Sequence, residues 1–160
     1  MSKAEHNKET GREEFSLVLR DGDKVIFSSR KRGLRPLLEC VAACAGKLRG
    51  GFLIDRVTGL AASRLITASR MINRLEAGVI SEGAVRHLRD HSIQVVWKQR
   101  TDIIRKSGGA GVCPMEELSQ RLPDDGDFFP AVFRHFSMNI PISLLKIPEN
   151  KKNALHPFYG

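Results

Sequence analysis

Residues 51–62 read Gly-Phe-Leu-Ile-Asp-Arg-Val-Thr-Gly-Leu-Ala-Ala, and this stretch decides the fold. Its apolar run, residues 52–54, predicts a short buried strand, and the small residues after Thr58 predict a helix. Thr58 is a residue type that caps helix N-termini, so we expect this helix to run from Thr58 to about residue 70. A buried strand that leads directly into a helix is typical of α/β folds.

The rest of the chain continues this alternation. Two apolar runs on either side of Asp21-Gly22-Asp23 predict a hairpin. Apolar residues spaced three and four apart from Leu34 onward predict a helix that Pro36 helps to begin. In chain order, we expect strands at 15–19, 24–28, 51–55, 73–80 and 93–98 and helices at 34–46, 58–70, 81–88 and 114–118. This order predicts an α/β fold, a three-layer αβα sandwich with a mixed sheet.

The pattern divides the chain into three segments. Residues 1–13 are polar and charged, which predicts a disordered tail, and residues 14–122 hold all the expected strands and helices, which predicts one domain. Residues 123–160 are a C-terminal appendage interrupted by prolines. We expect the appendage to be partly ordered, because Phe128, Phe129 and Phe133 are too apolar to remain in water.

Composition and charge exclude several classes of protein. The 160 residues include 26 Lys and Arg, 18 Asp and Glu and three Cys, with a formal net charge of +8. These values fit a globular domain rather than a disordered or disulfide-stapled chain. No apolar run approaches the roughly 20 residues that span a bilayer, and the N-terminus is not an apolar signal core. We therefore expect a cytoplasmic protein with reduced cysteines and no membrane partner.

The expected element order is that of the zinc-dependent nucleotide deaminases. Those enzymes hold zinc with His-x-Glu on one helix and Pro-Cys-x-x-Cys at the start of the next. Here the first helix opens with residues 33–39 and has no His, and the second opens with residues 55–59 and has no Cys. The sequence therefore predicts no metal site and no cofactor.

Four short motifs in a fixed order identify a related family. They are Arg32-Gly33-Leu34-Arg35-Pro36-Leu37-Leu38, Asp55-Arg56-Val57-Thr58-Gly59-Leu60-Ala61-Ala62, Val79-Ile80-Ser81-Glu82 and Gly111-Val112-Cys113-Pro114-Met115-Glu116-Glu117. Residues 15–122 thereby resemble an uncharacterised bacterial and archaeal family, a zinc-less domain of unknown function placed in the cytidine-deaminase-like superfamily. The resemblance implies a cytidine-deaminase-like fold of unestablished activity. The chain departs from the family pattern at Leu60, where a lysine is common, and at residues 106–109, where an Asn-Arg pair is expected.

A ligand site is expected where the strand at 51–55 leads into its helix. Ligands of open α/β sheets bind at the carboxyl ends of the strands, and this turn holds the place of the zinc motif in the deaminases. We expect it to bind a small anionic or nucleotide-like ligand. The residues assigned to this site are Arg35, Asp55, Arg56, Thr58, Gly59, Gly111 and Glu116. The alternative is that Asp55 caps the helix and Arg56 pairs on the surface.

Cys113 is a candidate for chemistry. It precedes Pro114, and a cysteine at a helix N-terminus is stabilised as the thiolate by unpaired N–H groups. The glutamates at 116 and 117 oppose this effect. One reading makes Cys113 the nucleophile of a cysteine-dependent sulfur or group transfer, and the other makes it a small buried capping residue. The glycines at 108–111 are expected to cradle an anion or to form a flexible connection.

A cluster of basic residues supports a different function. Lys24, Arg30, Lys31 and Arg32 lie in a stretch without acidic residues, which is typical either of a nucleic-acid-binding surface or of a solvated loop. Aromatic residues make up only 6% of the chain, so we expect phosphate contacts to dominate such binding. A third reading is an interaction protein that self-associates through the appendage.

Overall fold

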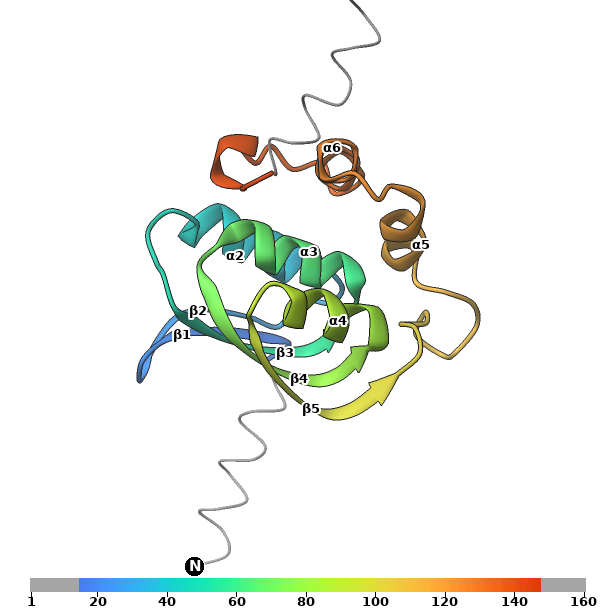
Figure 1. Cartoon of the computed structure of the whole chain (residues 1–160), viewed down its shortest axis with the longest axis horizontal. Coiled ribbons are helices and arrows are strands. Elements are labelled where there is room, and N and C mark those ends of the chain that lie inside the picture. Colours follow the sequence, from blue (N-terminus) through green and yellow to red (C-terminus); the bar gives the residue numbers. More distant parts are fainter. Residues whose placement is uncertain (1–14, 148–160) are drawn as a thin grey trace, which may run out of the picture.

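The computed structural model describes residues 15–147, and its framework is one five-stranded mixed sheet (Figure 1). The strand order is β2-β1-β3-β4-β5, with β1 antiparallel to both of its neighbours and β3, β4 and β5 parallel. The strands are β1 (Leu17–Asp21), β2 (Lys24–Ser29), β3 (Gly51–Thr58), β4 (Ile72–Ser81) and β5 (Gln94–Thr101). The helices are α2 (Arg35–Cys44), α3 (Leu60–Ser69), α4 (Glu82–Asp90), α5 (Pro114–Arg121) and α6 (Asp125–His135), followed by the 3-10 turn η1 (Ile142–Leu144). The expected α/β class and mixed sheet are confirmed.

Helices α2, α3 and α4 lie on the same face of the sheet (Figure 1). The reason is topological: each helix connects two parallel strands, and each of the three connections steps across the sheet in the same direction. Since such crossovers are right-handed, all three helices must cover the same face. Within residues 15–147 no helix covers the other face, so the described structure is not the three-layer sandwich that the sequence predicted.

Burial along the strands alternates as this arrangement requires. Leu17 and Leu19 of β1, Leu53 of β3 and Leu75 of β4 are buried beneath the helices. Their neighbours in sequence are half-buried or exposed on the other face. The apolar side chains of α2 and α3, among them Leu38 and Ile66, pack onto these strand residues and complete the core on the helical side of the sheet.

The segment predicted as an appendage packs onto the main core as a second helical layer. Phe128, Phe129, Val132 and Phe133 of α6 are buried in the same cluster as the residues beneath α2 and α3. Asp124 caps α6 by accepting a hydrogen bond from the Gly126 N–H. The expected tail at residues 1–13 and the last part of the appendage, residues 148–160, lie outside the described residues.

Two boundaries near the expected ligand site differ from the predictions. Strand β3 continues to Thr58, so Asp55 lies three residues before its end. The N-cap of α3 is Gly59, which has no side chain to accept a hydrogen bond, rather than Thr58, whose hydroxyl donates to Asp55. Ser81 caps α4, at the start of the helix expected from residue 81, by accepting a hydrogen bond from the Ala84 N–H. No helix in residues 15–147 is long and apolar enough to cross a membrane.

Candidate functional site

Asp55 and Thr58 form a buried polar pair near the carboxyl edge of the sheet. The Thr58 Oγ1 donates to Asp55 Oδ2 at 2.9 Å, and both residues are shielded from water. Burial raises the pKa of Asp55 to about 7, although the hydrogen bonds from Thr58 and from the backbone N–H groups of Val57 and Arg56 favour its ionised form. Near neutral pH this carboxyl group is thus poised between its protonated and ionised states.

Glu116 of α5 reaches the N-terminus of α3 and satisfies its backbone donors. Its Oε1 accepts the Leu60 N–H at 2.5 Å, and the N–H groups of Ala61 and Ile104 also donate to the carboxyl group. Glu116 is only 4% exposed, and burial raises its pKa. A Cβ at Gly59 would collide with the same carboxylate, so glycine is required for this approach. The chain's own carboxylate therefore occupies the donors that the sequence analysis assigned to an anion.

The structure brings together only part of the predicted ligand site. Asp55, Thr58, Gly59 and Glu116 converge, although α5 follows the α3 N-terminus by more than fifty residues. Arg35 does not join them: it donates to the Phe136 carbonyl at 3.1 Å and ties α2 to the end of α6. Arg56 is exposed, and Gly111 is exposed at the base of a turn in which the Lys106 N–H donates to the Gly111 carbonyl.

Cys113 is the N-cap of α5, as expected, and is half-buried. Its N–H donates to the Ile104 carbonyl at 3.0 Å. The other two cysteines, Cys40 and Cys44, are buried in α2, and burial raises the pKa of Cys40 far above its usual range. Cys113 is therefore the most accessible of the three thiols, and its reactivity stays a prediction.

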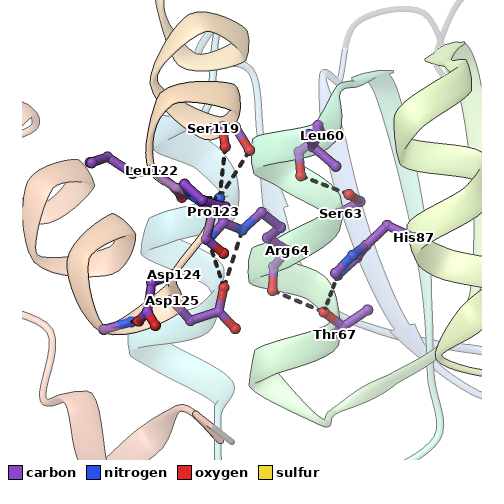
Figure 2. Close-up of polar contacts among 11 residues, drawn as sticks. Leu60, Ser63, Arg64, Thr67, His87, Ser119, Leu122, Pro123, Asp124 and Asp125 are labelled. Carbon is purple, nitrogen blue, oxygen red and sulfur yellow. Dashed lines mark hydrogen bonds and ion pairs between the residues drawn. The ribbon is translucent and has the colours of Figure 1, made fainter. Parts of the chain in front are cut away.

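The sequence analysis missed Arg64, which is the main polar link between the two helical layers (Figure 2). Arg64 is 5% exposed. Its guanidinium donates to the carbonyls of Ser119, Leu122 and Pro123, forms an ion pair with Asp125 at 2.7 Å and lies 3.8 Å from the centre of the Phe128 ring. The available signal was one arginine inside the otherwise apolar helix pattern of residues 60–69.

His87 of α4 and His91, the C-cap residue of that helix, are engaged in structural contacts. His87 Nε2 lies 2.9 Å from Thr67 Oγ1 (Figure 2), and His91 Nδ1 lies 2.7 Å from the His87 carbonyl. Burial lowers the pKa of His87 to about 4, so its ring is neutral at physiological pH. Residues 15–147 contain no cluster of three or more His, Cys, Asp or Glu side chains suited to a metal ion.

The basic cluster lies along edge strand β2 and the segment that follows it. Lys31 forms an ion pair with Glu39 at 2.7 Å, and the Arg30 guanidinium lies 4.8 Å from the centre of the Phe15 ring. A shallow surface depression is lined by residues 27–31 together with Phe15 and Glu39. Of the four predicted nucleic-acid residues, Arg30 and Lys31 line this hollow, and Lys24 and Arg32 do not.

The side of the sheet opposite α2, α3 and α4 presents an ordered array of side chains, which we call the helix-free face. Its members are Val18, Arg20, Val25, Ser28, Phe52, Ile54, Arg74, Glu76, Gln94 and Val96. The strand register arranges them in two rows that cross the sheet. One row runs Val25–Arg20–Phe52–Arg74–Gln94, and the other runs Ser28–Val18–Ile54–Glu76–Val96.

The first row joins cations to an aromatic ring. The Arg74 guanidinium lies 4.6 Å from the centre of the Phe52 ring, and Arg20 is the partner of Phe52 on the other side. The second row is mainly apolar and carries one acid, Glu76. Val25 and Val96, at the two edges, are 54% and 51% exposed. A surface of this kind combines apolar area with positive charge.

Comparisons with known proteins agree on one family. A search of the curated proteins finds no match. Among solved structures, the chain is similar to the crystal structure of a DUF1893 family protein, TM1506, from Thermotoga maritima, with a TM-score of 0.70 and 22% identity. That match covers 82% of this chain and 88% of the other.

The family model described as TM1506, domain of unknown function DUF1893, matches residues 6–136. This range includes α5 and α6 and therefore extends beyond residues 15–122, where the sequence motifs placed the resemblance. An uncharacterised family was expected from those motifs, and the chain belongs to the DUF1893 family.

Proposed function

We propose that this protein binds single-stranded nucleic acid across the helix-free face of its sheet. The observation that carries the proposal is the row Arg20–Phe52–Arg74, which places an aromatic ring between two cations on a sheet surface that no helix of residues 15–147 covers. This agrees with the nucleic-acid reading of the sequence but moves the centre of the surface from edge strand β2 to the middle of the sheet.

The chemistry of the row suits a single strand. Bases of single strands stack on aromatic side chains, and each such contact contributes about 1–3 kcal/mol with little sequence preference. Arg74 extends the ring of Phe52 with a planar guanidinium on which a second base can stack. The apolar side chains Val18, Ile54 and Val96 in the next row add contact area for bases.

Charge favours a polyanion over a second copy of this chain. Arg56 and Lys98 are exposed on the strands that carry the second row, two residues beyond Ile54 and Val96. With Arg20 and Arg74 they make four cations against one acid, Glu76. Two such faces in contact would bring like charges together, whereas phosphates complement them.

The basic cluster lies at the β2 edge of the sheet, beside this surface, where Lys31 pairs with Glu39 of α2. Strand β2 is the neighbour of β1, so Lys24 lies beside the first row at one end of the strand. Arg30, Lys31 and Arg32 follow the strand at its other end, where the Ser16 hydroxyl donates to the Lys31 carbonyl. These residues supply phosphate contacts outside the base-stacking region.

The test is fluorescence anisotropy of a labelled 12-nucleotide single-stranded RNA with the full chain, measured over a salt series. Arg74→Gln is compared with Arg86→Gln, which removes the same charge from the exposed side of α4. We expect Arg74→Gln to weaken binding more than Arg86→Gln does at every salt concentration, because it removes the guanidinium beside Phe52 on which a base stacks. Equal effects of the two variants would refute the proposal. If light scattering shows a dimer that Arg74→Gln dissociates, the face is a self-association surface instead.

A second candidate function rests on Asp55, Thr58 and Glu116, which lie at the carboxyl edge of the five-stranded sheet around the start of α3. Glu116 occupies the Leu60 N–H and Arg35 lies elsewhere, so this site favours a small neutral polar ligand over an anion. A thermal-shift screen of nucleosides and nucleotides on wild type and Asp55→Asn tests this site. A shift that Asp55→Asn abolishes would support it, and equal shifts in both proteins would reject it.

A further inference from the structure

Glu76 is an exception on the helix-free face. It lies in the central strand β4, with Ile54 and Val96 as its register partners and Arg74 two residues away on the same face. It is half-buried and makes no ion pair with another residue of the 15–147 range. An unpaired carboxylate between apolar side chains opposes the binding of any polyanion. Glu76 therefore does not contribute to attraction of the phosphate backbone, and a contact with the bases is the alternative.

We propose that Glu76 makes the surface selective for bases that present an amino group. This inference rests on the proposed function and names the bases that the same surface prefers. An ionised glutamate is only an acceptor, so it receives a hydrogen bond from the exocyclic amino group of cytosine and repels the O4 carbonyl oxygen of uracil. Cytosine and uracil have nearly the same shape, so the difference between them isolates this contact.

The register gives Glu76 the reach that this role needs. Phe52 and Glu76 lie on adjacent strands and two residues apart along them, which separates their Cα positions by about 8 Å. A base stacked on the Phe52 ring extends its hydrogen-bonding edge along the sheet surface over a comparable distance. Ile54 is the register partner of Glu76 and lies two residues from Phe52 on the same face, so it adds apolar surface beside the expected contact.

The experiment compares the affinities of the full chain for labelled octamers of cytidine and of uridine at pH 7.5 and low salt. We expect wild type to bind the cytidine octamer about fivefold more tightly, near the lower end of the discrimination that one polar base contact provides. Glu76→Gln should abolish the preference, because its amide both donates and accepts, and should raise affinity for both octamers. The matched control is Glu117→Gln, which removes the same charge from an exposed position on α5 and should leave the preference unchanged.

The possible outcomes separate the two proposals. Wild-type binding of both octamers with equal affinity would overturn the role of Glu76 and leave the proposed function standing. Binding of neither octamer would overturn both. A preference for cytidine that persists in Glu76→Gln would assign the selectivity to another residue, and circular dichroism of each variant confirms that the comparison concerns folded protein.

Discussion

Asp55 is a buried carboxyl group that accepts hydrogen bonds from neutral donors, the Thr58 hydroxyl and the backbone N–H groups of Val57 and Arg56. Its pKa rises from an ordinary value near 3.8 to about 7, so the folded state holds a proton that the unfolded state has already released between these pH values. The stability from this group is complete below about pH 4 and is lost as the pH rises through 7. The loss is on the order of 4 kcal/mol, and the raised pKa of Glu116 acts in the same direction.

Asp55→Asn should remove this pH dependence. The amide oxygen still accepts the Thr58 hydrogen bond but does not ionise. Urea denaturation at pH 5 and pH 8 measures the effect. We expect wild type to lose more unfolding free energy over this interval than Asp55→Asn does. Parallel losses in the two proteins would show that Asp55 titrates normally in the folded state.

The contact between Gly59 and Glu116 supports a second prediction at this scale. A Cβ at residue 59 would collide with the Glu116 carboxylate, so Gly59→Ala should destabilise the fold by about 2 kcal/mol. In a Glu116→Ala background the same substitution should cost much less, because the obstruction has been removed. Denaturation of the four proteins in this double-mutant cycle measures the coupling. Additive effects would mean that the two residues are not in contact.

Sequence patterns identified these residues but not their geometry. The motifs that hold Gly59 and Glu116 were assigned to one site, and the structure brings the two residues together. The sequence does not specify that Glu116 turns toward the N-terminus of α3 and fills the space expected for an anion. Thr58 was assigned to the helix cap on residue type alone, whereas its hydroxyl satisfies Asp55.

At the scale of elements, Arg64 fastens the C-terminal helices to α3. It donates to three carbonyl groups in the turn between α5 and α6 and pairs with Asp125 at the start of α6. Arg64→Ala leaves those carbonyls and the half-buried Asp125 without a donor, which should cost about 3–5 kcal/mol. Hydrogen exchange should show the largest loss of protection in α5 and α6. Arg86→Ala, on the exposed side of α4, serves as control, and equal protection in both variants would contradict the role of Arg64.

The sequence predicts the order of the helices along the chain but not the face of the sheet that they cover. Strand and helix order followed from the apolar periodicity, and every expected element is present. The two faces of the sheet were not distinguished, because the side on which α2, α3 and α4 lie depends on strand order. Once that order places β2 outermost beside β1, right-handed crossovers put all three helices on one face. Strand order reflects pairing between distant segments, which local periodicity does not encode.

For the whole molecule, the consequence of this topology is a division between its two sides. One side buries the core under two layers of helices, and within residues 15–147 the other side presents the helix-free face. The protein's charge of +8 favours any polyanion, so binding alone does not locate the surface. Variants that separate phosphate contacts from base contacts are needed for that purpose.

Such variants follow from the proposed division of the surface. Phosphate contacts position a nucleic acid and set the salt dependence of its affinity, whereas base contacts set its selectivity. A variant in which Lys24, Arg30, Lys31 and Arg32 are all glutamine should lower the salt slope of RNA binding and keep the preference between octamers.

Phe52→Leu should weaken binding of every octamer by about 1–3 kcal/mol and leave the salt slope unchanged, because leucine fills the space but does not stack. Anisotropy titrations over a salt series measure both quantities. If Phe52→Leu changes nothing while the quadruple variant abolishes binding, the nucleic acid contacts only the β2 edge, and the middle of the sheet has another partner.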